Sequence, residues 1–279
     1  MTVQMSNDDV LKGISADINS GRTEGLTDRI SELADSTDDP FEVLKYMSLL
    51  KLIPRDGTES KLANRVVSMS DQSNGLALAT GLRNLDCHIF ALDILKKLEP
   101  TDQVERLRCH CLYDIEEYES AMETYYKIKA PVINDRILLS NILSSVGEHR
   151  KAIEAAEQLL SEYPNDYDVR IAYVRALMMG GNNKEALKYA RAGLKDKSAD
   201  SNAVAAYVLR VQGNIKAAGG YAARAVQLNN SHIGAMESLG ICLALKGEIE
   251  KAKITAGAIN EISPGDKAAI NILSYCDGN

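Results

Sequence analysis

The chain has 279 residues, of which 45% are hydrophobic and 25% charged, and this ordinary globular composition excludes a disordered, collagen-like or disulfide-rich protein. Alanine and leucine dominate while aromatic residues are scarce, with no Trp and two Phe, which favours closely packed helices over a β-sandwich or barrel. The net charge of −7 argues against a nucleic-acid-binding protein, because neutralising phosphates requires a surplus of Lys and Arg.

The first predicted elements are two short amphipathic helices followed by a more apolar one. Apolar residues recur at helical spacing between residues 10 and 18 and again between 26 and 33, with glycines separating the two runs. Asp39 followed by Pro40 is typical of an N-cap with proline at the first helical position. The sequence therefore predicts a third helix from Pro40 through Ile53.

The first half of the chain then continues with a loose repeat. Ala63, Ala91 and Ala121 each lie near the start of a predicted second helix of a hairpin, and they are spaced by 28 and 30 residues. Glu116 stands where a glycine would be expected in the turn before Ala121. The short spacing predicts hairpins with trimmed helices rather than the loss of a hairpin.

A more regular phrase recurs in the second half of the chain. It consists of a glycine, four mostly polar residues and an alanine, and a second alanine follows one helical turn later. The glycine can adopt the left-handed conformation that ends a helix, and the paired alanines let two helices approach closely. The first alanines are 34, 32 and 34 residues apart, which fits a helix–turn–helix unit. The four phrases are Gly147–Ala152, Gly181–Ala186, Gly213–Ala218 and Gly247–Ala252.

A last helix is predicted over residues 266–276. Ile270 and Tyr275 fall off its apolar stripe, so the end of the stack is partly apolar, which suggests self-association through this helix or its cover by another protein. The stripe that we expect to face the preceding helices consists of Ala268, Ala269, Ile272, Leu273 and Cys276.

These features together resemble the tetratricopeptide repeat family. The resemblance rests on the first-helix motif Leu239–Leu243, the turn glycine, the paired alanines, and a proline that ends the unit, as at Pro164 and Pro264. It implies an all-α fold, a right-handed α-solenoid of about eight antiparallel helix pairs plus a C-terminal helix. We expect a single helical-repeat domain over residues 1–279. Its predicted parts are degenerate hairpins over 1–131, regular repeats over 132–264 and a capping helix over 265–279.

In the resembled family the first helix of each pair lines a concave groove, and this register predicts the binding residues. The three arginines among them would suit an acidic or carboxylate-bearing segment of a partner protein. Ile137 and Ala172 stand where family members that bind a chaperone C-terminus need polar groups, which argues against that ligand. The predicted partner-binding residues are Arg106, His110, Tyr113, Asn141, Arg175, Met178, Tyr207 and Arg210, and the register adds Asn134, Ser144, Asp168, Ile171, Met179 and Asp200.

No motif for catalysis, nucleotide binding or a cofactor is present, and no enzyme activity is expected. Cys109 and Cys111 are of metal-ligating type, but two residues apart on a helix they point about 200° from each other, so we interpret them as apolar filler rather than metal ligands. The acidic run from Asp114 to Glu119 is interpreted as a solvated turn.

The function predicted from the sequence is a non-enzymatic scaffold or adaptor that holds a segment of a partner protein in its concave groove. The alternative is a structural subunit of a larger complex that contacts partners through its ends and convex face. No stretch is long and apolar enough to insert in a membrane, and five unevenly spread cysteines favour the reducing cytoplasm.

Overall fold

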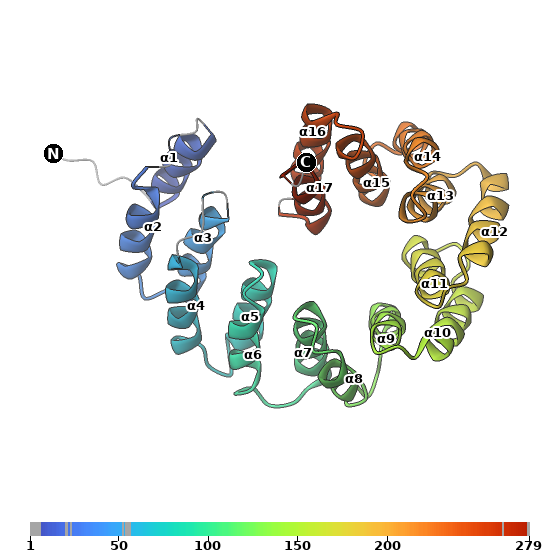
Figure 1. Cartoon of the computed structure of the whole chain (residues 1–279). Coiled ribbons are helices and arrows are strands. Elements are labelled where there is room, and N and C mark those ends of the chain that lie inside the picture. Colours follow the sequence, from blue (N-terminus) through green and yellow to red (C-terminus); the bar gives the residue numbers. More distant parts are fainter. Residues whose placement is uncertain are drawn as a thin grey trace. The chain divides into compact units, whose positions relative to one another are not determined.

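The computed structural model describes residues 7–19, 22, 24–51, 53, 57–263 and 265–277. Within these residues the chain forms 17 α-helices and one 3₁₀ turn, and no strand (Figure 1). The predicted all-α fold is therefore confirmed. None of the described helices is long and apolar enough to cross a membrane.

The chain divides into two compact units, Met1–Pro131 and Val132–Asn279. This border falls where the sequence changes from loose to regular repeats; that the two units form one domain stays a prediction. The helices of the first unit are α1 (Asn7–Asn19), α2 (Leu26–Asp35), α3 (Pro40–Leu50), α4 (Thr58–Ser68), α5 (Gly75–Asn84), α6 (His88–Leu95), α7 (Asp102–Asp114) and α8 (Tyr118–Tyr125).

The second unit has four helix pairs and a terminal helix, so that the described chain contains the predicted eight pairs and one further helix. Pro164 follows α10 as predicted, whereas Pro264 lies outside the described residues. The helices are α9 (Ile133–Ser145), α10 (His149–Glu162), α11 (Tyr167–Met179), α12 (Asn183–Gly193), α13 (Ala199–Val211), α14 (Ile215–Leu228), α15 (Ile233–Ala244), α16 (Ile249–Ile262) and α17 (Lys267–Asp277), with the 3₁₀ turn Leu194–Asp196 after α12.

The start of α3 follows the sequence closely, but its end does not. The Asp39 side chain accepts a hydrogen bond from the Phe41 amide at 2.9 Å, and Pro40 is the first helical residue, as predicted. The helix ends at Leu50 rather than at Ile53. The Ile53 amide donates to the Leu50 carbonyl three residues back, so the chain has left the α-helical pattern there.

The alanines that define the repeat all lie between helices. One alanine near the start of each second helix from α4 to α16 is completely buried, which confirms their predicted role in close helix packing. These residues are Ala63, Ala91, Ala121, Ala152, Ala186, Ala218 and Ala252.

The turns inside the pairs share one geometry. The glycines of the four regular phrases have φ between 78° and 83°, and the next amide donates to a leucine carbonyl five residues back, as from Asn214 to Leu209 at 2.8 Å. This pattern satisfies the free carbonyls at a helix end. Glu116 occupies the same position with φ 65°, and so does Asp86 with φ 60°. The turn predicted at Glu116 therefore forms without glycine.

In the second unit, the first helices of the pairs differ from the second helices in their contacts. Each first helix contacts the next one, from α9 through α11, α13 and α15 to α17, whereas no comparable contact joins successive second helices. Figure 1 shows α9, α11, α13 and α15 on the inner side of this unit and α10, α12 and α14 on its outer side. The first helices thus form one continuous surface, which we call the first-helix surface.

The terminal helix α17 packs against α15 and α16 through one of its faces. Ala269 and Ile272 are completely buried, and a Cβ at Gly240 of α15 would overlap the Ile272 side chain. The glycine in the first-helix motif therefore permits the close approach of α17. Ile270 and Tyr275 remain exposed, as their position off the stripe predicted.

Candidate functional site

Four of the predicted binding residues meet on the first-helix surface. Arg175 of α11 donates from Nη1 to Oδ1 of Asn141 on α9 and from Nε to the Tyr207 hydroxyl on α13, both at 3.4 Å. The Arg210 guanidinium lies 5.5 Å from the centre of the Tyr207 ring, and that of Arg175 lies 6.0 Å from it. These residues form a polar row that crosses three successive first helices.

The repeat itself aligns this polar row. Asn141, Arg175 and Tyr207 are 34 and 32 residues apart, so they occupy the same position in consecutive pairs, and Arg210 lies one turn after Tyr207. The Arg210 Nε is buried and has no hydrogen-bond partner among the described residues. The positive charge of Arg210 also acts on Cys242. Burial raises the pKa of the Cys242 thiol, and the charge of Arg210 lowers it.

A cavity of about 730 Å³ adjoins the polar row. Its wall is built by α11, α13 and the starts of α15 and α17, so all of it belongs to the second unit. The charged and polar side chains that line it include Asp168, Arg175, Tyr207, His232, Glu237 and Asn271.

Buried aromatic and acidic groups determine the electrostatics of this cavity. Burial raises the pKa of the Tyr167 phenol well above its ordinary value, and the carboxylates of Glu237 and Asp168 raise it further. Burial also raises the pKa of Asp168, helped by the neighbouring Asp166 carboxylate. Tyr167 therefore stays neutral. The lining of the cavity combines acidic side chains with the basic Arg175.

His232 lines the cavity from the turn that precedes α15. Its side chain is 7% exposed, its Nδ1 accepts a hydrogen bond from the Ala235 amide at 3.3 Å, and its Nε2 lies 3.3 Å from a carboxylate oxygen of Asp200. The ring packs against the edge of Tyr167 with centroids 4.5 Å apart. A Cβ at Gly234 would overlap the Tyr167 hydroxyl, so the absence of a side chain there lets the tyrosine ring lie against α15.

The other four of the eight predicted partner-binding residues, Arg106, His110, Tyr113 and Met178, lie outside the polar row. Arg106, His110 and Tyr113 share one face of α7 in the first unit, where Arg106 Nη2 donates to the Ala130 carbonyl at 3.4 Å and the Tyr113 ring packs against another tyrosine. Met178 is partly buried against the core around α11 and α13. The structure thus brings together Asn141, Arg175, Tyr207 and Arg210 in the polar row, with the predicted Asp168 and Ile171 in the adjoining cavity.

Two residues of the cavity were missed by the sequence analysis although the repeat contains the signal for them. Glu237 Oε1 accepts a hydrogen bond from Asn271 Nδ2 at 2.6 Å. Both continue the register of Ile171 at the repeat spacing, but the predicted residues stopped at α13. His232 also stands at a repeat spacing, 34 residues after Ser198, and both side chains cap a first helix, but the period does not indicate that the His232 ring contacts Tyr167.

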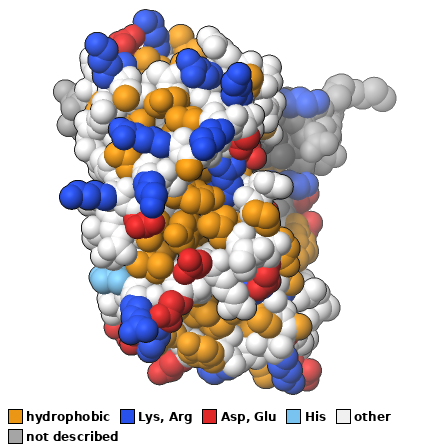
Figure 2. Space-filling model, turned by 90° about the vertical axis from the view of Figure 1, so that its right-hand side faces the viewer, with side chains coloured by type: hydrophobic (Ala, Val, Ile, Leu, Met, Phe, Trp, Pro, Cys, Tyr) orange, Lys and Arg blue, Asp and Glu red, His pale blue; other side chains and the backbone are white. Residues whose placement is uncertain are grey.

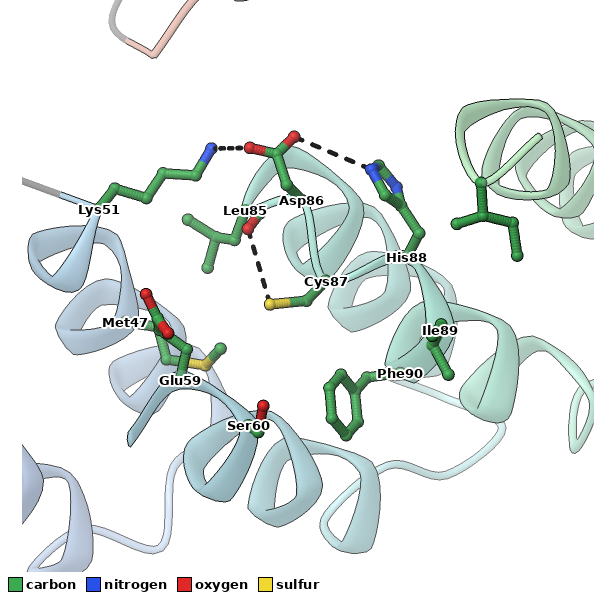
Figure 3. Close-up of a pocket in the computed structure, with 11 residues that line it drawn as sticks. Met47, Lys51, Glu59, Ser60, Leu85, Asp86, Cys87, His88, Ile89 and Phe90 are labelled. Atoms are coloured by element: carbon green, nitrogen blue, oxygen red, sulfur yellow. Dashed lines mark hydrogen bonds and ion pairs between the residues drawn. The ribbon is translucent and has the colours of Figure 1, made fainter. Parts of the chain in front are cut away.

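The first unit has a separate cavity of about 210 Å³ (Figure 3). Lys51 Nζ pairs with Asp86 at 2.9 Å, Asp86 lies 3.9 Å from His88 Nε2, and the Cys87 thiol donates to the Leu85 carbonyl. Within the described part of the chain, no three His, Cys, Asp or Glu side chains are arranged to hold a metal ion.

Two of the first-unit cysteines are buried, whereas the acidic run is exposed at Glu116, Glu117 and Glu119, as predicted, but not at Asp114. Cys109 and Cys111 are both fully buried, and the Cys109 thiol donates to the Ala121 carbonyl at 3.3 Å. Asp114 differs from the solvated residue that we predicted. Its side chain is 14% exposed and pairs with Arg83 at 2.9 Å, because α5 packs against α7 at this point.

Comparisons with known proteins agree with this fold. The family model described as tetratricopeptide repeat matches residues 144–207, so the predicted resemblance is confirmed and this stretch contains tetratricopeptide repeats. No curated protein matches the chain.

Solved structures that match the chain include two tetratricopeptide repeat proteins. A tetratricopeptide repeat protein from Parabacteroides merdae is 11% identical, with a TM-score of 0.50 over 90% of this chain and 99% of that chain. A thermophilic tetratricopeptide repeat protein from Thermus thermophilus is 14% identical, with a TM-score of 0.45 over 63% of this chain and 98% of that chain.

Proposed function

We propose that the first-helix surface of the second unit binds an extended segment of a partner protein. Tetratricopeptide repeats generally serve as scaffolds for protein–protein interaction. The observation that carries the proposal is the polar row of Asn141, Arg175, Tyr207 and Arg210 beside a cavity of about 730 Å³. We propose no catalytic role and no cofactor, because these side chains are arranged along a surface rather than around a reacting centre.

The charges of the surface indicate which side chains the segment carries. Arg175 and Arg210 flank the Tyr207 ring, so an acidic side chain or a C-terminal carboxylate fits between them as an acceptor of charge-assisted hydrogen bonds. Asp168 and Glu237 also line the cavity. A partner segment with an acidic residue followed by a hydrogen-bond donor or a basic residue would match both the arginines and these carboxylates.

The test begins with affinity purification from the native cell, mass spectrometry, and synthesis of the segment that binds. Its affinity is then measured for the wild type and for Arg175→Ala and Arg210→Ala at two salt concentrations. Because an Arg–carboxylate bond shielded from water contributes about 1.5–3 kcal/mol, each variant should bind roughly ten- to a hundredfold more weakly. Arg150→Ala on α10, with 93% side-chain exposure, is the control and should bind as the wild type does.

The second candidate function is a structural subunit that contacts its partners, or a second copy of itself, through the end of the array. The exposed Ile270 and Tyr275 on α17 favour it, being 44% and 37% exposed. Unchanged affinity in both arginine variants, with loss of binding after Ile270→Ser, would support this function instead. For either function we propose a cytoplasmic location, to which five free cysteines are suited.

A further inference from the structure

The outer face of the second unit has a local charge opposite to that of the whole chain. Its helices α12 and α14 together contain five Lys and Arg but one acidic residue, Glu185, although the chain as a whole has a net charge of −7. Such a concentration of one sign on one part of a surface attracts groups of the opposite charge.

The exposed cations of α12 and α14 differ from those of the neighbouring helices α10 and α16 in their pairing with acidic side chains. On α10, Arg150 pairs with Glu154 at 2.9 Å, and on α16 Lys251 pairs with Glu248 at 2.7 Å. On α12 and α14 no ion pair involves the exposed cations within the described part of the chain. These are Lys184, Lys188, Arg191, Lys216 and Arg224.

Apolar side chains lie between these cations. Leu187 and Tyr189 of α12 and Tyr221 of α14 are half-buried and pack against the underlying core, in which Leu209 and Ala218 are buried. Figure 2 views this side of the molecule and shows hydrophobic side chains gathered at its centre, with Lys and Arg around them in the upper part. We call this combination of an apolar seam and unpaired cations the α12–α14 face.

We propose that the α12–α14 face is a second docking surface, which binds an acidic amphipathic segment of a partner protein. The exposed cations would pair with the acidic residues of the segment, while its apolar residues would cover Leu187 and Tyr221. A bilayer fits less well, because its insertion requires apolar side chains that protrude beyond the charged ones, and here they are half-buried. A nucleic acid would pair with the cations but leave the apolar seam in water.

A synthetic helical peptide with Glu on one side and Leu on the other is the probe, used with the full chain. Fluorescence anisotropy at low salt should show binding that weakens as salt screens the charges. The double variant Lys188→Glu/Arg224→Glu should bind the peptide at least about tenfold more weakly, because it replaces attraction by repulsion. Substituting Ser for Leu, or Lys for Glu, in the peptide should also weaken binding.

The matched control is Arg150→Glu/Lys253→Glu, which changes the net charge equally but on α10 and α16. At about 0.15 M salt, where the Debye length is about 8 Å, it should keep the affinity within about threefold of the wild type, because distant charges are screened. The loss caused by Lys188→Glu/Arg224→Glu should be the same in the wild-type and in the Arg175→Ala background, because Arg175 is not part of the α12–α14 face, so a failure of the groove proposal is distinguishable. Circular dichroism and thermal melting check that both double variants are folded.

Three results would overturn the proposal. The first is no binding of the peptide by the wild type, and the second is an equal loss in both double variants. The third is tighter binding of phosphatidylserine vesicles or single-stranded DNA than of the peptide, abolished by Lys188→Glu/Arg224→Glu, which would assign the face to a membrane or a nucleic acid.

Discussion

At the scale of single residues, the turns inside the helix pairs show what the chain requires of a side chain. Gly213 has φ 80° and Glu116 has φ 65° in equivalent turns. A residue with a Cβ is strained in this conformation, at a cost of roughly 1–2 kcal/mol, whereas glycine adopts it freely. A Cβ at Gly213 would meet no atom within 4 Å, so only the backbone conformation distinguishes the two turns.

We predict opposite effects from exchanging the residue type at these two positions. Gly213→Ala should lower the free energy of unfolding by about 1 kcal/mol or more, because alanine must adopt a positive φ. Glu116→Gly should leave it unchanged or raise it by up to about 1 kcal/mol, because relief of strain is partly offset by a more flexible unfolded chain. Urea denaturation measures both, and a stabilising Gly213→Ala would contradict this account.

At the scale of helices, the buried alanines determine how closely the two helices of a pair approach. Ala186 and Ala218 near the starts of α12 and α14 are completely buried, and α13 and α14 are in extensive contact. A larger side chain at either position would have to displace the facing helix, since protein interiors are densely packed. The repeat therefore depends on small residues at these positions.

Ala186→Leu or Ala218→Leu should consequently lower the free energy of unfolding by roughly 1–3 kcal/mol through overpacking. Lys184→Ala, an exposed position in the same helix as Ala186, should change it by under about 0.5 kcal/mol. Thermal and urea unfolding of the three variants provide the comparison. Leucine variants as stable as the wild type would show that these alanines do not lie in the packed interface.

At the scale of the whole molecule, each unit contains its own hydrophobic core. In the first unit a cluster of buried residues reaches from Ile14 to Cys111. The second unit has several, among them one around α15, α16 and α17 that includes Ile241 and Ile259. A unit whose buried surface is internal is expected to fold by itself, as repeat arrays of several pairs do.

We therefore predict that a fragment of residues 132–279 folds alone, with a helical circular dichroism spectrum and a cooperative thermal transition. A shorter fragment of residues 132–244 is the control. It lacks α16 and α17, exposes Met236 and Ile241, and should melt at a lower temperature. An unfolded 132–279 fragment would show instead that this unit depends on residues 1–131.

Much of the architecture could be predicted because local sequence signals that recur along the chain specify it. The spacing of Ala152, Ala186, Ala218 and Ala252 alone locates four pairs, and the small side chain itself requires close packing. Asn141, Arg175 and Tyr207 follow from the same period, because equal positions in successive pairs lie side by side in a regular array. Where the sequence signal repeats, the position of a residue in the repeat indicates its position in the fold.

Other features of the structure could not be predicted from the repeat period, because they depend on contacts between segments far apart in the chain. The sequence indicates neither that Arg175 bonds to Asn141 and Tyr207, nor that Asp114 is shielded by Arg83, since each contact requires two helices to be placed first. It determined the helical repeat, its turns and the surface that the first helices share. Only the tertiary structure decided which of those surface side chains are engaged with each other, because hydrogen-bond partners are selected by distance in space and not by distance in sequence.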